Sequence, residues 1–301
     1  MRHYACCYPH CCGVCFLVTL CMMKSGRRRC NLVFGLPRQR GSIFFLFAVA
    51  EDRAFSGARY EKVRIDGRVV SQGVLIVSAV REDGMREIIA LEVADTESEA
   101  TYHELFRSLK RRGLSGVELV VSDDHEGLKA ADCRHFQGAA HQRCQVHYSR
   151  NLLGMVGASK RKELGAELRA IFAAPNREQA LRILSSVADR WRSKGNEKVA
   201  CHIEEHIEEC LTCLAFPESH RRRIRTTNSR ERVNQEIKRR TRVVRIFPNR
   251  ESCLRLVTAL AVEVSEEWVT GRRYLDMEEL GEHRGLEEPV VDSEEAMIME
   301  S

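Results

Sequence analysis

Two carboxylates, Asp123 and Glu231, lie at positions where they could bind a catalytic divalent cation. Asp123 directly follows the apolar run VELVVS at residues 117–122, and the string DDHEGLKAA turns at once into a helical pattern. The carboxyl end of a buried strand, just before a helix, is a common place for a catalytic group in an α/β sheet. Together with Glu231, Asp123 could hold a divalent cation such as Mg²⁺, which prefers a few carboxylates, water and phosphate oxygens.

Each carboxylate also has a purely structural interpretation. Asp123 or Asp124 could be the N-cap of the helix expected at residues 125–133. The spacing Asn228-x-x-Glu231 matches a capping box, in which the Glu side chain bonds back to the cap amide. Local spacing alone therefore leaves helix capping and catalysis open at both positions.

Glu231 lies in a strongly basic segment. Residues 221–242 contain ten Lys or Arg and two acids, Glu231 and Glu236, whereas residues 276–301 contain ten acids and one Arg. Such a segment, in a chain of net charge +5, favours a polyanionic partner, although a charge run can also be a solvated helix face. A metal held by the acids and a DNA backbone held by the bases would explain the mixture. The candidate DNA-binding residues are Arg225, Arg230, Arg232, Lys238, Arg239, Arg240 and Arg242.

Cysteine spacing gives a weaker signal. Cys144-x-x-His147, with His141 nearby, resembles half of a zinc site, but no second half follows at a usual spacing. A buried Cys and a hydrogen-bonded His are the favoured interpretation. The 13 cysteines show no disulfide framework, which indicates a reducing cytoplasm. The apolar run at residues 11–23 is shorter than the about 20 residues that a membrane span needs, so no membrane partner is expected.

The elements that must position these residues follow an α/β pattern. Residues 60–94 hold three β-rich runs separated by turns at Asp66-Gly67 and at 82–84, which predicts an antiparallel meander. A capping box beginning at Thr96 opens a helix that ends at Gly113. Its apolar face consists of Tyr102, Leu105, Phe106 and Leu109.

The segments before and after this α/β core differ from it in their hydrophobic pattern. Residues 158–216 have helical spacing without a strand pattern, which predicts an all-helical insertion, and the basic segment is expected to be a helix from Asn228. Residues 1–56 contain cysteine clusters and the run IFFLFAVA, without a sustained helical or strand period. We expect an irregular, disordered leader there.

Five strings, in this order between Ala58 and Met277, resemble the mutator-type transposases of bacterial insertion sequences: ARYEKVR, VVSDDHEGLKAA, QRCQVHYSRNLL, RIRTTNSRERVNQEIKRRTRVVRIFPN and SCLRLV. The resemblance implies a ribonuclease H-like catalytic domain with an Asp-Asp-Glu triad and two Mg²⁺ or Mn²⁺ ions. The family's second Asp corresponds to Asp123 and its Glu to Glu231. Its Cys-x-x-His signature corresponds to Cys144 and His147.

One position of this pattern departs from the family. The family's first Asp stands directly before Ala-x-Tyr-x-Lys-x-Arg, and this chain has Gly57 there, which offers no ligand atom. Asp52 lies in the leader and Asp66 at a turn, so neither is a convincing substitute. The family's N-terminal DNA-recognition region also has no counterpart here. We therefore expect a truncated or degenerate copy in which the coding sequence resumes near Ala58.

The sequence thus predicts an α/β protein with a ribonuclease H-like mixed sheet, flanking helices and an all-helical insertion. The expected segments are a leader (1–56), the first part of the catalytic domain (57–154), the insertion (155–220), the rest of the catalytic domain with the basic helix (221–275) and an acidic tail (276–301).

The expected function is DNA transposition by metal-dependent attack on a phosphodiester, first by water and then by a DNA 3′-hydroxyl. Expected partners are insertion-sequence ends and target DNA, bound by a homo-oligomer at the bacterial nucleoid. The alternatives are a catalytically impaired DNA-binding remnant and a plain ribonuclease H-like nuclease.

Overall fold

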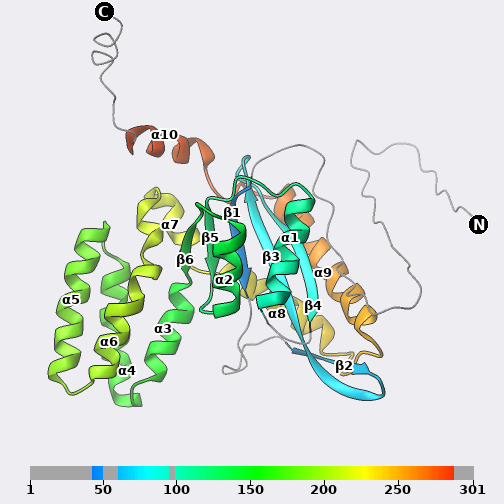
Figure 1. Cartoon of the computed structure of the whole chain (residues 1–301), viewed down its shortest axis with the longest axis horizontal. Helices are drawn as coiled ribbons and strands as arrows, with labels where there is room; N and C mark the ends of the chain where they lie inside the picture. The colour runs from blue at the N-terminus through cyan, green and yellow to red at the C-terminus, as the bar shows by residue number, and fades with distance from the viewer. Residues whose placement is uncertain (1–42, 50–59, 95–98, 288–301) are drawn as a thin grey trace, which may run out of the picture.

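The structure, a computed structural model, describes residues 43–49, 60–94 and 99–287 (Figure 1). Gly57, Asp52 and Thr96 lie outside these ranges, as does most of the leader. For β1, Tyr60, residues 228–232 and residues 285–287 the structure describes the backbone alone. The strands are β1 (Ile43–Val49), β2 (Tyr60–Ile65), β3 (Arg68–Arg81), β4 (Arg86–Ala94), β5 (Leu119–Ser122) and β6 (Ala140–Arg143).

Helices make up most of the remainder. In chain order they are α1 (Glu99–Arg111), α2 (Glu126–His135), α3 (Gln145–Gly154), α4 (Ala158–Phe172), α5 (Arg177–Ser193), α6 (Glu197–His206), the 3-10 turns η1 (Ile207–Cys210) and η2 (Thr212–Ala215), α7 (Glu218–Ile224), α8 (Asn228–Thr241), α9 (Arg250–Thr270) and α10 (Met277–Glu287).

The six described strands form one mixed sheet. β1, β2 and β4 each pair with β3 in antiparallel orientation, whereas β5 runs parallel to β1 and β6 runs parallel to β5. Parallel neighbours end at the same edge of a sheet. The segments that follow β1, β5 and β6 therefore leave from one edge, and Asp123 is the first residue after β5.

The predicted meander of β2, β3 and β4 is confirmed. Asp66 and Gly67 both have positive φ, 49° and 78°, as a two-residue hairpin turn requires. The second turn contains Gly84, with a φ of 77°. A Cβ atom there would lie 2.1 Å from the carbonyl oxygen of Leu275, so this turn needs glycine for close approach as well as for its φ.

The expectation of an irregular leader is wrong for residues 43–49. These residues form β1, which lies between β3 and β5 near the middle of the sheet. A strand of a sheet that helices cover on both faces is often apolar along its whole length, so the run IFFLFAV does not need to alternate. The lack of a period was therefore no argument against a strand.

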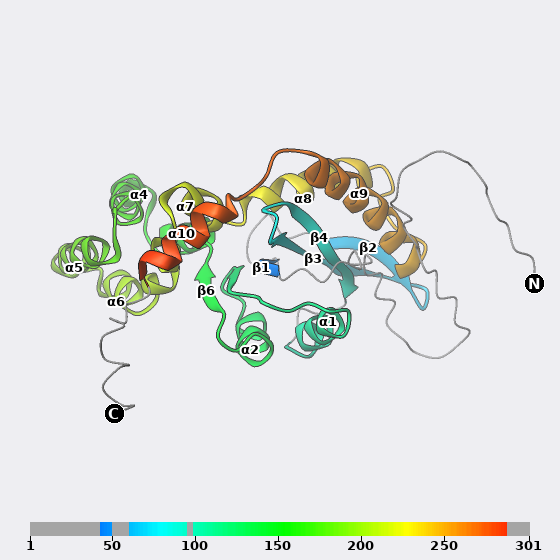
Figure 2. The ribbon, with the colours of Figure 1, turned by 90° about the horizontal axis from the view of Figure 1, so that it is seen from above.

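Helices cover both faces of the sheet (Figure 2). α1 and α2 lie on one face, and α8 and α9 lie on the other. The predicted apolar face of α1 is confirmed, because Tyr102, Leu105, Phe106 and Leu109 are buried in one cluster with sheet residues. On the opposite face, Val233 and Ile237 of α8 pack in a second cluster with residues of β2, β3, β4 and α9.

Helices α3 to α7 stand beside the β6 edge of the sheet (Figure 1). Helices α3 to α6 share a hydrophobic cluster of their own, which includes the fully buried Trp191 and Tyr148, whereas Ile224 of α7 packs with residues of the sheet. The helical spacing predicted for residues 158–216 agrees with α4, α5, α6 and the two 3-10 turns. Among the described helices, none is both long and apolar enough to span a bilayer.

Asp132 on α2 gives a pH-dependent prediction. It is 4% exposed, and burial raises the pKa of its carboxyl from 3.8 to about 7. The unfolded state therefore releases this proton first, and stability is lost as the pH rises from about 4 to 7. Asp132→Asn is expected to increase the free energy of unfolding by about 1–4 kcal/mol at pH 8 and to change it much less at pH 4.

Urea unfolding at both pH values measures this effect. Asp189→Asn, at an exposed position of α5, is the control and should shift stability little at either pH. An equal effect of Asp132→Asn at pH 4 and pH 8 would show that burial does not perturb this carboxyl.

Candidate active site

The first candidate carboxylate, Asp123, is 8% exposed and stands at the carboxyl end of β5. α2 begins at Glu126 with His125 as its N-cap, and the N-cap side chain makes no capping hydrogen bond. Neither Asp123 nor Asp124 is therefore the cap of this helix. The structural interpretation of these two acids as N-caps is wrong.

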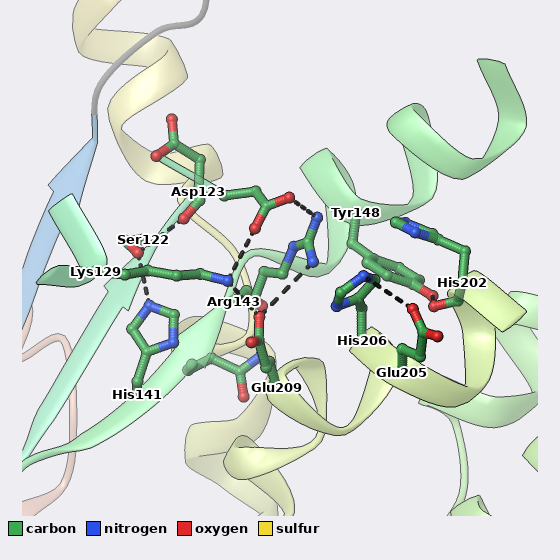
Figure 3. A network of polar contacts seen from close by, with 12 residues as sticks. Ser122, Asp123, Lys129, His141, Arg143, Tyr148, His202, Glu205, His206 and Glu209 are labelled. Atoms are coloured by element: carbon green, nitrogen blue, oxygen red, sulfur yellow. Dashed lines mark hydrogen bonds and ion pairs between the residues drawn. The ribbon is translucent and has the colours of Figure 1, made fainter. Parts of the chain in front are cut away.

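A short hydrogen-bond chain fixes the strand end beside Asp123 (Figure 3). Ser122 Oγ donates to the carbonyl oxygen of Asp123 at 2.9 Å and lies 2.7 Å from His141 Nε2. Since the hydroxyl proton is already used, His141 must donate through Nε2. Burial lowers the pKa of His141 to about 4, which keeps the imidazole neutral at pH 7.

Asp124 belongs to a different set of contacts, an ionic network of four side chains (Figure 3). Arg143 on β6 is 1% exposed, and its guanidinium binds the carboxylate of Asp124. Lys129 Nζ lies 2.9 Å from Asp124 Oδ1 and 2.6 Å from Glu209 Oε2. The network joins the loop after Asp123 to β6 and to η1, so the helical region and the candidate site hold each other in place.

The Cys-x-x-His pair lies at a junction of three segments. Cys144 is completely buried, and its backbone amide donates to the carbonyl oxygen of Ser122 at 2.7 Å. Its Sγ accepts hydrogen bonds from the Thr227 amide and hydroxyl, both at 3.4 Å, and His147 lies close enough to influence the charge of the thiol. The buried Cys of the favoured interpretation is confirmed, whereas a hydrogen-bonded His147 stays a prediction.

Charge at this junction shifts both pKa values. Burial would raise the pKa of Cys144, but the neighbouring side chain and charge of His147, with the Thr227 contact, lower it to about 7. Burial would lower the pKa of His147, but the neighbouring Cys144 side chain and the charges of Cys144 and Asp123 raise it. His147 therefore lies within the electrostatic reach of Asp123.

The junction anchors the start of α8 next to the end of β5. The backbone N–H of Gln145 donates to the carbonyl oxygen of Arg225 at 3.0 Å. This backbone hydrogen bond adds to the contacts that Thr227 makes with Cys144. α8 begins at Asn228, as predicted, with Thr227 as its N-cap, so Asn228 is not the cap that the capping-box interpretation needs. Glu231 falls on the first turn of this helix.

The expected meeting of Asp123 and Glu231 stays a prediction, because the Glu231 side chain lies outside the described part. Within that part, no group of three His, Cys, Asp or Glu residues is arranged to hold a metal ion. Asp124 is engaged by Arg143 and Lys129, and His147 lies close to Cys144. Asp123 therefore fits as one ligand, and a metal site depends on Glu231 for a second.

The basic face of α8 is partly neutralised. Arg239 and Arg240 both bond to Glu236, at 2.6 and 3.0 Å, and these hydrogen bonds lower the pKa of Glu236 to about 2. Lys238 and Arg242 are exposed, and Arg225 is half-buried just before α8. The structure does not describe the side chains of Arg230 and Arg232. Part of the positive charge predicted for DNA is thus already paired within the helix.

Together these features define an α/β domain with a carboxylate at a strand end and a basic helix anchored beside it. Comparison with known families makes the assignment specific. Residues 53–271 match the model of the Mutator family of transposases, and the chain belongs to this family.

Curated relatives are transposases for bacterial insertion sequences. The chain is 46% identical over 223 residues to the transposase for insertion sequence element IS406 of Burkholderia multivorans, covering 74% of this chain and 57% of the relative. It is 45% identical to the ISRM5 transposase of Rhizobium meliloti, covering 76% of this chain and 57% of the relative. The chain thus spans just over half the length of these relatives.

Two further matches are more distant. The transposase for IS256 in transposon Tn4001 of Staphylococcus aureus is 34% identical, covering 73% of this chain and 56% of the relative. The solved Drosophila P element transposase strand transfer complex is 10% identical, covering 83% of this chain and 72% of that chain, with a TM-score of 0.25. A TM-score this low supports no conclusion about the fold.

Cys144→Ala tests the junction. The change removes the acceptor of two Thr227 donors and is expected to cost about 1–3 kcal/mol of stability, because buried donors are left without a partner. Hydrogen exchange at the Thr227 amide should accelerate, whereas Cys144→Ser, which keeps an acceptor, should restore part of the protection. Cys133→Ala, at an exposed cysteine, is the control. Unchanged exchange at Thr227 would show that the thiol does not hold α8.

Proposed function

We propose that this chain acts on DNA as the catalytic part of a transposase, with Asp123 and Glu231 as metal ligands. The observation that carries the proposal is the junction at Cys144, which bonds on one side to Ser122 and on the other to Thr227. Ser122 directly precedes Asp123, and Thr227 is four positions before Glu231. The segments that carry the two acids therefore each have a residue that bonds to Cys144, which supports the proposal.

The sheet supports a ribonuclease H-like fold for this domain. β3 pairs with β4 along residues 73–80 and with β1 along residues 76–81, so β3 lies between them. The order β4-β3-β1-β5-β6 combines an antiparallel part with a parallel part. In this arrangement the ends of β1 and β5 are neighbours, and Asp123 directly follows β5.

The residues of the chain have distinct roles in the proposed reaction. Mg²⁺ or Mn²⁺ bound by Asp123 and Glu231 would supply an activated nucleophile and charge stabilisation at the phosphate. Ser122, with His141, orients the backbone at Asp123, and Cys144 positions the start of α8. Arg and Lys side chains of residues 221–242 bind the DNA phosphates. The DNA would be insertion-sequence ends and target, bound by a homo-oligomer.

A second candidate function is a catalytically impaired DNA-binding remnant. The observation that favours it is Gly57, at the position where the family's first Asp is expected. In that case the basic residues, with α8 held by the junction, would still bind DNA, while cleavage would be weak or lost.

Nicking of a supercoiled plasmid with and without Mg²⁺ tests the proposal. We expect slow, Mg²⁺-dependent nicking by the original chain, and a reduction of at least about tenfold for Asp123→Asn and for Glu231→Gln, as expected when one ligand of a metal centre is lost. Asp189→Asn, which removes an exposed acid of α5, is the control and should nick like the original chain. Nicking that survives in Asp123→Asn would overturn the proposed site, and no nicking by any chain would favour the remnant.

A further inference from the structure

A large groove runs between α3, α4 and α7. Its volume is about 1410 Å³, and the described residues that line it include no Asp or Glu. Six of them are arginines: Arg150, Arg161, Arg169, Arg222, Arg223 and Arg225. Three of these come from the helical region before α7, which the sequence analysis did not connect with DNA.

The groove differs from α8 in how its arginines are paired. On α8, Arg239 and Arg240 share the carboxylate of Glu236. In the groove, Arg169 and Arg222 are exposed and form no ion pair with any described carboxylate. Arg223 donates to the carbonyl oxygen of Tyr274 and lies 5.6 Å from its ring centroid, so its positive charge is not cancelled by an acid. The groove therefore offers positive charge that no described acid neutralises.

The groove begins at the junction that holds the candidate site. Gln145 and Val146 line it on one side and Thr226 on the other. Gln145 directly follows Cys144, and Thr226 directly precedes Thr227, the two residues whose contacts anchor α8. A strand that passes Asp123 and leaves the sheet edge on this side would enter the groove.

We propose that this groove binds the phosphodiester backbone of the DNA that extends from the cleaved position. The inference rests on the proposed function, because it places the DNA relative to Asp123. Several guanidinium groups without a competing carboxylate suit phosphates, since each can donate two parallel hydrogen bonds to one phosphate group. The helical region is then a DNA-binding surface as well as a connection between Asp123 and Glu231.

Salt-dependent binding of a fluorescein-labelled DNA duplex, without Mg²⁺, tests the groove. Arg169→Ala/Arg222→Ala should weaken binding and flatten the plot of log affinity against log salt by about 1–2 units, because each lost phosphate contact removes about 0.9 unit. Arg177→Ala/Arg182→Ala is the matched control. It removes the same charge from α5, where Arg177 pairs with Glu208 and Arg182 pairs with Glu178. All four arginines are exposed, so both variants should keep the stability of the original chain.

Photo-cross-linking locates the contact. Benzoylphenylalanine in place of Ala173, which lines the groove, should cross-link to the duplex, whereas the same group in place of the exposed Ser185 on α5 should not. Equal salt slopes for the two double variants, or no cross-link from position 173, would overturn the inference. These experiments need no cleavage, so their results are independent of the nicking assay. Groove binding without nicking would refute the proposed catalysis alone. Nicking without groove binding would refute this inference alone.

Discussion

Gly57→Asp is expected to raise Mg²⁺-dependent nicking about 100-fold above the original chain. The resemblance predicts the family's first Asp at position 57, where this chain has a Gly without a side chain that could bind a cation. A third carboxylate would strengthen metal binding beside Asp123 and Glu231, and a gain of about 2.7 kcal/mol in the stabilisation of the transition state corresponds to this factor. Initial rates on supercoiled plasmid, with and without Mg²⁺, measure it.

Two variants make this result interpretable. Gly57→Asn adds a side chain of similar size without the charge and should give much less activation. Asp52→Asn in the original chain tests the competing carboxylate, because Asp52 comes three residues after the end of β1. Fast nicking by the original chain that Asp52→Asn abolishes would contradict the assignment to position 57.

Arg143→Ala should destabilise the fold by about 2–5 kcal/mol, the range for replacing a large buried side chain with alanine. Arg143 is 1% exposed and bridges Asp124, after β5, to Glu209 in η1. Its loss leaves Lys129 as the described cation between these two carboxylates and opens a cavity under β6. Urea unfolding, monitored by far-UV circular dichroism, gives the free energy of unfolding.

Arg177→Ala is the control, since Arg177 forms an exposed ion pair with Glu208 and such pairs contribute about 0–1 kcal/mol. If Arg143→Ala cost no more than Arg177→Ala, the ionic network would not be what joins the helical region to the candidate site.

Much of the fold could be predicted because local signals were strong. The Asp66-Gly67 turn, the apolar face around Leu105 and the start of α8 at Asn228 each rest on a pattern of a few neighbouring residues. β1 was missed because a strand of a sheet covered on both faces carries no polar alternation, so its apolar run looked irregular. β6 was missed because AHQR is only four residues long and mostly polar.

The candidate site was predictable where chemistry depends on single residue types. Asp123 stood out by its place after an apolar run, and Glu231 by its charge among bases. The roles of Arg143, Lys129 and Glu209 could not be read from the sequence, since their contacts join segments far apart in the chain. Thr227 was equally hidden, because only folding brings it to Cys144.

Binding of Mn²⁺, followed by electron paramagnetic resonance of the free ion, tests most directly whether Asp123 and Glu231 share one metal centre. Relative to the original chain, the variants Asp123→Asn and Glu231→Gln should each bind Mn²⁺ at least about tenfold more weakly, as expected when a metal ligand is lost. The double variant should be little weaker than either single one, because residues of one site are not additive. Glu236→Gln should bind Mn²⁺ like the original chain. If either single variant kept the original affinity, or if the two losses multiplied as independent sites do, the two carboxylates would not form one centre.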